Sequence, residues 1–270
     1  MVGERDLIQN SVLPRVNVVG LQANVCGSLE KVVEQIAQMA RRGAGDYVCF
    51  STVHMAMESY DDPRFGKVVN GADFIVTDGM PLVWMQKLQG AQEAARVRAN
   101  DLMISLCEYA EKNNLKIGFY GGKPEVIEAI RARAAKDFPN LQIVYAFSPP
   151  FRALTEEEDR EITDEINSAG AQILFVGLGC PKQERWMAAH RGKVKAVMLG
   201  VGASFDFYAG NVSESPAWLG NLGLEWLYRL TQEPRRLWRR YLILNPRFMM
   251  LAALQLAGLK KFEEETRQKQ

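Results

Sequence analysis

Three segments of the sequence carry side chains that could take part in a reaction. Asp78 stands in TDGMP (77–81), directly after a short apolar run and before Gly79. A carboxylate there could act as a general base, and it could equally be the N-cap of the following helix. GLGCPKQE (177–184) and GGKPE (121–125) place glycines just before a predicted helix, whose N-terminus attracts anions. Together the segments predict a site for an anionic ligand beside a carboxylate.

The glycine-containing segments do not match the common cofactor motifs. Neither contains G-x-G-x-x-G or the P-loop sequence, so the chain does not predict a nicotinamide or ATP site. In the longer segment, Gly177 and Gly179 would let the backbone approach a ligand, and Gln183 stands in the predicted first helical turn. The alternative interpretation is an ordinary loop followed by a solvated helical turn.

Two charged residues bracket a further candidate segment, RVRANDL (96–102). Arg96 could bind a phosphate, and it could equally be a surface charge. Asp101 suits the first turn of a helix, where the helix dipole favours an acid.

The pattern of metal-binding residue types argues against a metal or another cofactor. No two aspartates are separated by a single residue, so the chain lacks a D-x-D motif that could bridge a metal to a nucleotide diphosphate. The four cysteines form no C-x-x-C, and only His54 and His190 could assist them, so a structural zinc is not predicted. The charge of a diphosphate would then have to be met by helix N-termini and arginines.

The C-terminal part of the chain concentrates positive charge. RLTQEPRRLWRRYL (229–242) contains five arginines, and residues 229–261 carry a local charge of +7 in a chain of net charge +1. Trp238 and Tyr241 interleave with the arginines, which suits a helix in a membrane interface better than nucleic-acid binding, while a solvated basic helix is the simpler alternative. The apolar run FMMLAALQLAGL (248–259) is too short to span a bilayer.

The elements that must position these residues follow a β–α alternation. The chain has 270 residues, of which 47% are hydrophobic, enough to bury a full core. Repeated alternation predicts a Rossmann-like, mostly parallel sheet with helices on both faces, and ligands of such sheets bind at the carboxyl ends of the strands. The predicted strands are 15–21, 47–50, 73–76, 116–122, 141–147, 172–179 and 196–202. The predicted helices are 28–43, 80–90, 101–114, 123–138, 155–170 and 181–192.

The pattern changes near residue 213. The remaining segments read as helices separated by Pro216, Pro234 and Pro246, and none reads as a strand. We therefore predict a Rossmann-like catalytic core over residues 1–212. Residues 213–270 are predicted to form a helical appendage.

Five motifs in this order resemble one glycosyltransferase family. They are DGMPLVW (78–84), RVRANDL (96–102), GLGCPKQERW (177–186), GVGASFDFYAG (200–210) and GLEWLYRLTQEPRRLWRRYL (223–242). Over residues 15–245 the chain is similar to the WecG/TagA/CpsF family, glycosyltransferase family 26. The sequences VHM (53–55) and DGMPLVW (78–84) are closer to the xanthan-type exopolysaccharide branch than to the teichoic acid branch. The resemblance implies a Rossmann-like core with an appendage that completes the active site and contacts the membrane.

The resemblance also implies roles for individual residues. Asp78 would be the catalytic base. Thr52 and His54 occupy the positions of a Thr-x-Asn segment near the donor sugar, with histidine here in place of asparagine, and Ala99 replaces a usual glycine. The other residues that the resemblance implies to bind substrate are Arg96, Gln183, Arg229, Arg236 and Arg239, and Asp101 and Gly177 join them as candidates from the segments described above.

The implied activity is an inverting, metal-independent transfer from a UDP-sugar, of the hexose or N-acetylmannosamine type, to a polyprenyl-diphosphate-linked saccharide. The expected location is cytoplasmic, peripheral on the inner face of the cell membrane. The expected partners are the donor, the acceptor and that membrane surface, with a homo-oligomer as an option and no nucleic acid. An inactive membrane-docked scaffold is the alternative, and retention of Asp78 and Gln183 argues against it.

Overall fold

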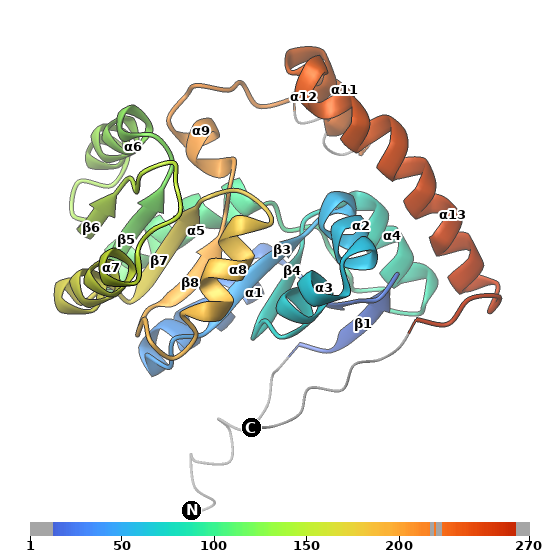
Figure 1. Cartoon of the computed structure of the whole chain (residues 1–270), viewed down its shortest axis with the longest axis horizontal. Helices are drawn as coiled ribbons and strands as arrows, with labels where there is room; N and C mark the ends of the chain where they lie inside the picture. Colours follow the sequence, from blue (N-terminus) through green and yellow to red (C-terminus); the bar gives the residue numbers. More distant parts are fainter. Residues whose placement is uncertain (1–12, 217–218, 220–222, 263–270) are drawn as a thin grey trace, which may run out of the picture.

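A six-stranded parallel sheet forms the centre of the computed structural model, which describes residues 13–216, 219 and 223–262. Its strand order is β4-β3-β8-β7-β5-β6, and every neighbouring pair is parallel, which confirms the predicted sheet (Figure 1). The strands are β3 (Tyr47–Ser51), β4 (Phe74–Thr77), β5 (Lys116–Gly121), β6 (Gln142–Phe147), β7 (Ile173–Gly177) and β8 (Val197–Gly200).

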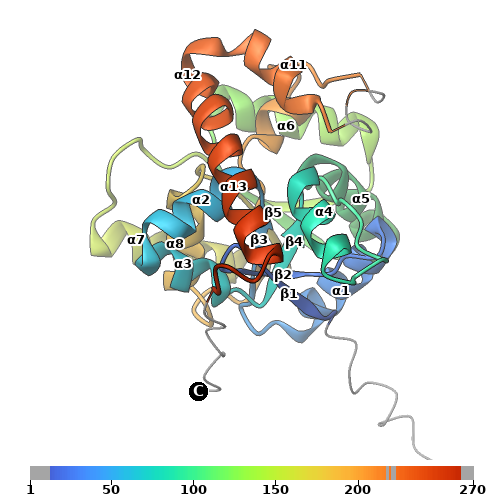
Figure 2. The same ribbon diagram turned by 90° about the vertical axis from the view of Figure 1, so that its right-hand side faces the viewer.

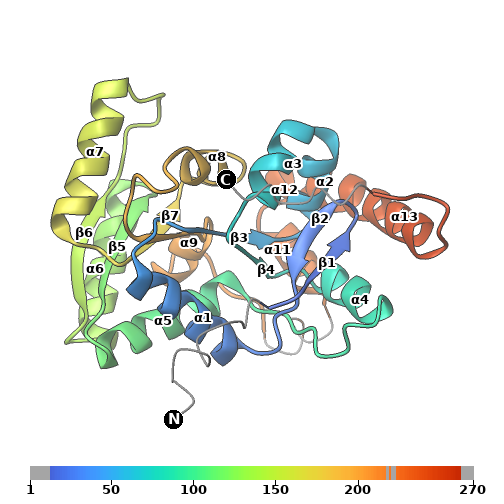
Figure 3. The same cartoon turned by 90° about the horizontal axis from the view of Figure 1, so that it is seen from below.

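Helices cover both faces of this sheet, as predicted. Alternate strand residues such as Phe119 and Tyr120 point into two separate apolar clusters. One cluster contains residues of α1 (Leu29–Arg42), α5 (Ala99–Lys112), α6 (Pro124–Asp137) and α9 (Ser204–Tyr208). The other contains residues of α2 (Val53–Asp61), α3 (Pro63–Asn70), α4 (Met80–Leu88), α7 (Glu156–Ala169) and α8 (Lys182–Ala189). Figure 3 shows α1 and α5 opposite α3 and α8.

The prediction of a sheet strand at 15–21 was wrong. This segment and the next form an antiparallel hairpin of β1 (Arg15–Val18) and β2 (Leu21–Asn24), separate from the main sheet. Val19 and Gly20 both have positive φ, 52° and 89°, as a two-residue hairpin turn of this kind requires. Asn24 attaches the hairpin to the edge strand, because its side-chain oxygen accepts a hydrogen bond from the Ile75 N–H at 2.8 Å.

The C-terminal helices form an arm against the core. The chain continues as α11 (Glu225–Gln232), α12 (Pro234–Arg239), the π-helical turn η1 (Arg240–Leu244) and α13 (Asn245–Leu256), which confirms the predicted C-terminal helices. The predicted break at Pro246 is absent, because the preceding π-helical turn accommodates the missing N–H of proline.

The last helix packs on the core instead of extending away from it. Phe248, Leu251 and Ala252 of α13 are buried in the cluster that also contains α2. Figure 2 shows α13 running beside α2 and α4. Within the described ranges, none of the helices is long and apolar enough to cross a membrane. The division at residue 213 stays a prediction.

Candidate active site

A cavity of about 940 Å³ lies at the carboxyl edge of the sheet. The segments that follow β3, β4, β5, β7 and β8 all contribute to its wall, as expected for the ligand edge of an open parallel sheet. Helices α11 and α12 and the π-helical turn supply Glu225, Arg229, Leu237 and Arg240 to the same cavity. The cavity is therefore built jointly by the core and the C-terminal arm.

Asp78 lies between β4 and α4, at the wall of this cavity. Its backbone N–H donates to the Ser51 carbonyl at 3.0 Å, which fixes it beside the end of β3. Gly79 is the N-cap of α4 and that helix has no side-chain cap, so the alternative interpretation of Asp78 as its N-cap is wrong. The carboxylate instead accepts the N–H of Ala99, the first residue of α5, at 3.3 Å.

The carboxyl group of Asp78 is held in an environment that disfavours its charged form. Burial raises the pKa of Asp78, and the nearby carboxylate of Glu225 raises it further. The positive charges of Arg96 and Arg98 and the hydrogen bond from Ala99 act in the opposite direction without cancelling the effect of burial. A carboxylate with a raised pKa at a cavity wall suits proton abstraction near neutral pH.

Arg96 contacts carboxylates, which sequence reasoning did not anticipate. Its Nη2 lies 2.7 Å from Glu225 Oε2 and 3.4 Å from Asp78 Oδ1. Its Nε donates to the backbone carbonyl of Asp78 at 2.5 Å. A smaller cavity of about 130 Å³ adjoins this cluster and also contacts Arg240. Arg96 therefore lies beside Asp78, bound to acids from both the core and the arm.

Thr52 and His54 lie at the start of α2, on the cavity wall. Thr52 is the N-cap of α2 and accepts the N–H of Met55 at 3.3 Å. Burial, together with the positive charge of Arg240, lowers the pKa of His54 to about 4. Glu58 lies 3.5 Å from the ring of His54, but its side chain is 44% exposed and its charge is therefore largely screened.

Gln183 connects the end of β7 to the end of β8. Its side chain is buried, donates to the Gly200 carbonyl at 2.7 Å and accepts the Gly179 N–H at 3.1 Å. At Gly177, a Cβ would lie 2.4 Å from the ring of Phe205, so only glycine fits there. Both residues line the cavity. Gln183 thus holds the glycine loop in place as well as facing the ligand space.

The three arginines of the C-terminal segment that were predicted to bind the diphosphate differ in their position relative to the cavity. Arg229 lines the cavity, lies 5.1 Å from the ring of Phe207 and buries its Nε without an acceptor among the described residues. Arg239 is exposed, lies over the Trp238 ring at 5.9 Å and is not among the residues that line the cavity, so its role in binding the diphosphate stays a prediction. The side chain of Arg236 lies outside the described residues. Arg240, one helical turn beyond Arg236 in the chain, lines the cavity.

Asp101 lies in the first turn of α5, as its spacing predicted. It pairs with Arg98 at 3.5 Å, and its side chain is 42% exposed. Its neighbours Arg98, Ala99 and Asn100 line the cavity, whereas Asp101 does not. Sequence reasoning also missed Glu225, which stands in the quoted GLEW segment without an assigned role.

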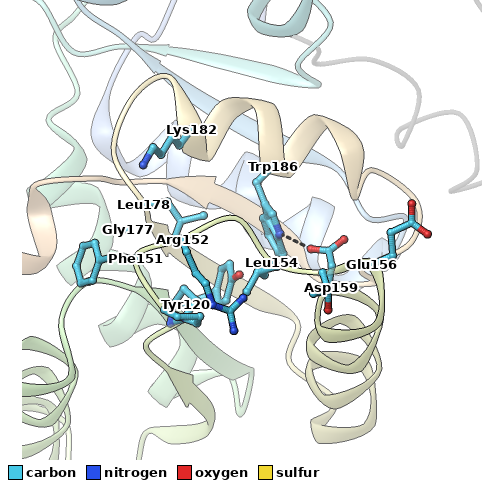
Figure 4. Close-up of a pocket in the computed structure, with 14 residues that line it drawn as sticks. Tyr120, Phe151, Arg152, Leu154, Glu156, Asp159, Gly177, Leu178, Lys182 and Trp186 are labelled. Atoms are coloured by element: carbon cyan, nitrogen blue, oxygen red, sulfur yellow. Dashed lines mark hydrogen bonds between the residues drawn. The ribbon is translucent and has the colours of Figure 1, made fainter.

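A second pocket, of about 390 Å³, opens beside the main cavity (Figure 4). Tyr120 and Trp186 form its aromatic side, and the indole N–H of Trp186 donates to Asp159 at 3.2 Å. Gly177 and Leu178 separate it from the main cavity and contribute to both walls. Asp78 lines the main cavity and is not among the residues that line this pocket.

The fold and the cavity define a Rossmann-like α/β protein with a carboxylate and several arginines around a ligand site. Comparison with known proteins identifies it more closely. The family model of the glycosyl transferase WecG/TagA/CpsF family matches residues 16–262. The chain belongs to this family and is a glycosyltransferase.

Two relatives carry the same descriptive name, N-acetylglucosaminyldiphosphoundecaprenol N-acetyl-beta-D-mannosaminyltransferase. The protein of Bacillus spizizenii (strain W23) is 34% identical over 199 residues, which are 73% of this chain and 75% of the relative. The protein of Bacillus subtilis (strain 168) is 32% identical over 216 residues, 78% of this chain and 81% of the relative. Each similarity covers more than two thirds of this chain and of the relative.

Proposed function

We propose that this chain transfers a sugar from a UDP-sugar to a saccharide linked to polyprenyl diphosphate, with inversion and without a metal. The observation that carries the proposal is the carboxylate of Asp78 at the wall of a cavity that also contains Arg98, Arg229 and Arg240. A nucleotide diphosphate needs such cations, and the names of both relatives specify a diphosphoundecaprenol-linked acceptor.

In the proposed step, an acceptor hydroxyl attacks the anomeric carbon of the donor. The new C–O bond forms as the bond to the diphosphate breaks, the hydroxyl proton passes to Asp78, and UDP leaves with the bonding electrons. Arginines around the cavity stabilise the charge that grows on the leaving diphosphate. Attack opposite the leaving group inverts the anomeric centre.

The donor and the setting are parts of the same proposal. We infer a donor of the UDP-hexose or UDP-N-acetylmannosamine type and a role in the synthesis of a surface polysaccharide, at the inner face of the membrane. His54 stands where the family resemblance gives asparagine, and its side chain reaches the cavity. We therefore expect this position to contribute to donor choice.

The test is UDP release from a panel of UDP-sugars with a short-chain polyprenyl-diphosphate sugar as acceptor, with EDTA present. Release from one donor only when the acceptor is added is the expected result. Release that requires added Mg²⁺ or Mn²⁺ would contradict the metal-independent step. No transfer from any donor, in detergent or in liposomes, would contradict the proposed function as a whole.

A further inference from the structure

The C-terminal arm supplies a carboxylate that competes with Asp78 for Arg96. Glu225 on α11 and Asp78 after β4 both approach the same guanidinium nitrogen. The separation is 2.7 Å to Glu225 and 3.4 Å to Asp78. A charge-assisted bond is strongest near about 2.8 Å, so Arg96 is bound tightly by Glu225 and only loosely by Asp78.

The loose contact leaves Asp78 available to take a proton. A carboxylate in a tight ion pair with arginine is a weaker base, because the pair stabilises its charged form. Arg96 cannot move freely, since its Nε is held by the Asp78 carbonyl. Glu225 therefore determines which way the free end of the guanidinium points.

We propose that Glu225 is a positioning residue that holds the Nη2 of Arg96 away from the carboxylate of Asp78 and keeps the base competent only while the C-terminal arm is docked. The inference rests on the proposed role of Asp78. Glu225 is 15% exposed at its side chain and also lies 3.6 Å from the Nε of Arg98, so it is enclosed by two arginines of the segment before α5.

The charged groups that face this cluster come from several elements. Asp78 lies after β4, Arg96 and Arg98 precede α5, and Glu225 belongs to α11. Asp101 lies in the first turn of α5 and interacts with the charge of Asp78. The other charged or titratable residues that line the adjoining cavity are His54, Arg229, Arg240 and Tyr241.

Glu225→Gln removes the charge but keeps the size of the side chain. Arg96 should then turn to Asp78, so kcat should fall about tenfold, within the range of general-base effects, with the donor KM changed by less than about twofold. The acid limb of the kcat–pH profile should move to lower pH. Glu225→Asp, which restores the charge, should recover part of kcat and return the limb toward its wild-type position.

Glu214→Gln is the matched control for docking of the arm. Glu214, in the segment that precedes the arm in the chain, contacts Arg98 at 3.0 Å and Asn100, in the first turn of α5, at 2.6 Å, and neither contact involves Arg96. We expect this variant to leave the acid limb in place. An equal shift in both variants would show that opening of the arm, and not the position of Arg96, is responsible, and would overturn the inference.

The remaining outcomes also decide the question. Unchanged kcat in folded Glu225→Gln, or a lower kcat with an unmoved acid limb, overturns the inference. Complete loss in both folded Glu225 variants would assign Glu225 a direct contact with substrate and overturn the positioning role. If wild type is inactive or Asp78→Asn is fully active, the proposed function itself fails, which is a distinguishable result.

Discussion

Burial shifts the pKa of two side chains on the cavity wall, Asp78 and His54. Asp78 has a raised pKa because it is buried, and Arg96 offsets this only in part. His54 is kept neutral by burial and by the charge of Arg240. These two titrating groups lie on one cavity wall, at the ends of neighbouring strands. Acidification should therefore affect the protein through both.

His54 should make the protein less stable as the pH falls. The pKa of this residue is about 4 in the folded chain against 6.5 for the unperturbed group, so the unfolded chain binds the proton first. The contribution of neutral His54 to the free energy of unfolding is lost as the pH falls from 6.5 toward 4. Between pH 7 and pH 5 this loss should lower the free energy of unfolding by about 2 kcal/mol. Urea unfolding at both pH values should show a smaller decrease for His54→Asn. An identical decrease in the two proteins would contradict this account.

At the scale of elements, the six strands of the sheet were predictable because buried parallel strands are short apolar runs that end in glycine or polar residues. The hairpin was missed because its turn, Val19–Gly20, lies inside one apolar run. Helices α2 and α3 were missed because they are short and meet at Asp62.

The candidate site was predictable to the extent that its residues follow strand ends. Asp78, Thr52 and Gln183 all do so, and all line the cavity. Glu225 was not predictable as a partner of Arg96, because the two residues are 129 positions apart and meet only when the arm docks. Local spacing carries no information about such a contact.

The docking of α13 should depend on its buried face. Phe248 is fully buried in the cluster shared with α2, whereas its neighbour Met249 is 52% exposed. Phe248→Ala should lower the free energy of unfolding by about 3–5 kcal/mol, through lost burial and the cavity left behind. Met249→Ala should change it by less than about 0.5 kcal/mol. Equal effects in urea denaturation would show that α13 does not pack as described.

At the scale of the whole molecule, the C-terminal arm presents an apolar and basic surface. Trp238, Leu242, Met249 and Met250 are each about half exposed along α12, the π-helical turn and α13. Arg235 and Arg239 are exposed on the same arm. This composition suits the interface of an anionic membrane, as we propose, and it leaves Glu225 and Arg229 of α11 on the cavity side.

Replacing the two exposed arginines should weaken binding to anionic vesicles. Each basic residue near such a surface is worth about 1 kcal/mol, so Arg235→Ser with Arg239→Ser should reduce binding to phosphatidylglycerol vesicles about thirtyfold in sedimentation assays. The matched control is Arg131→Ser with Arg160→Ser, on the exposed surfaces of α6 and α7, which should change binding little. Equal losses in the two double variants would indicate attraction by net charge alone.

In the proposed reaction, Asp78 takes the proton of the acceptor hydroxyl. The most direct measurement compares the rate of lipid-linked product formation by wild type, Asp78→Asn and Asp164→Asn, an exposed aspartate on α7. Loss of the general base should slow Asp78→Asn by about 10²–10⁴-fold while Asp164→Asn matches wild type. Product formation by folded Asp78→Asn at the wild-type rate would contradict the account.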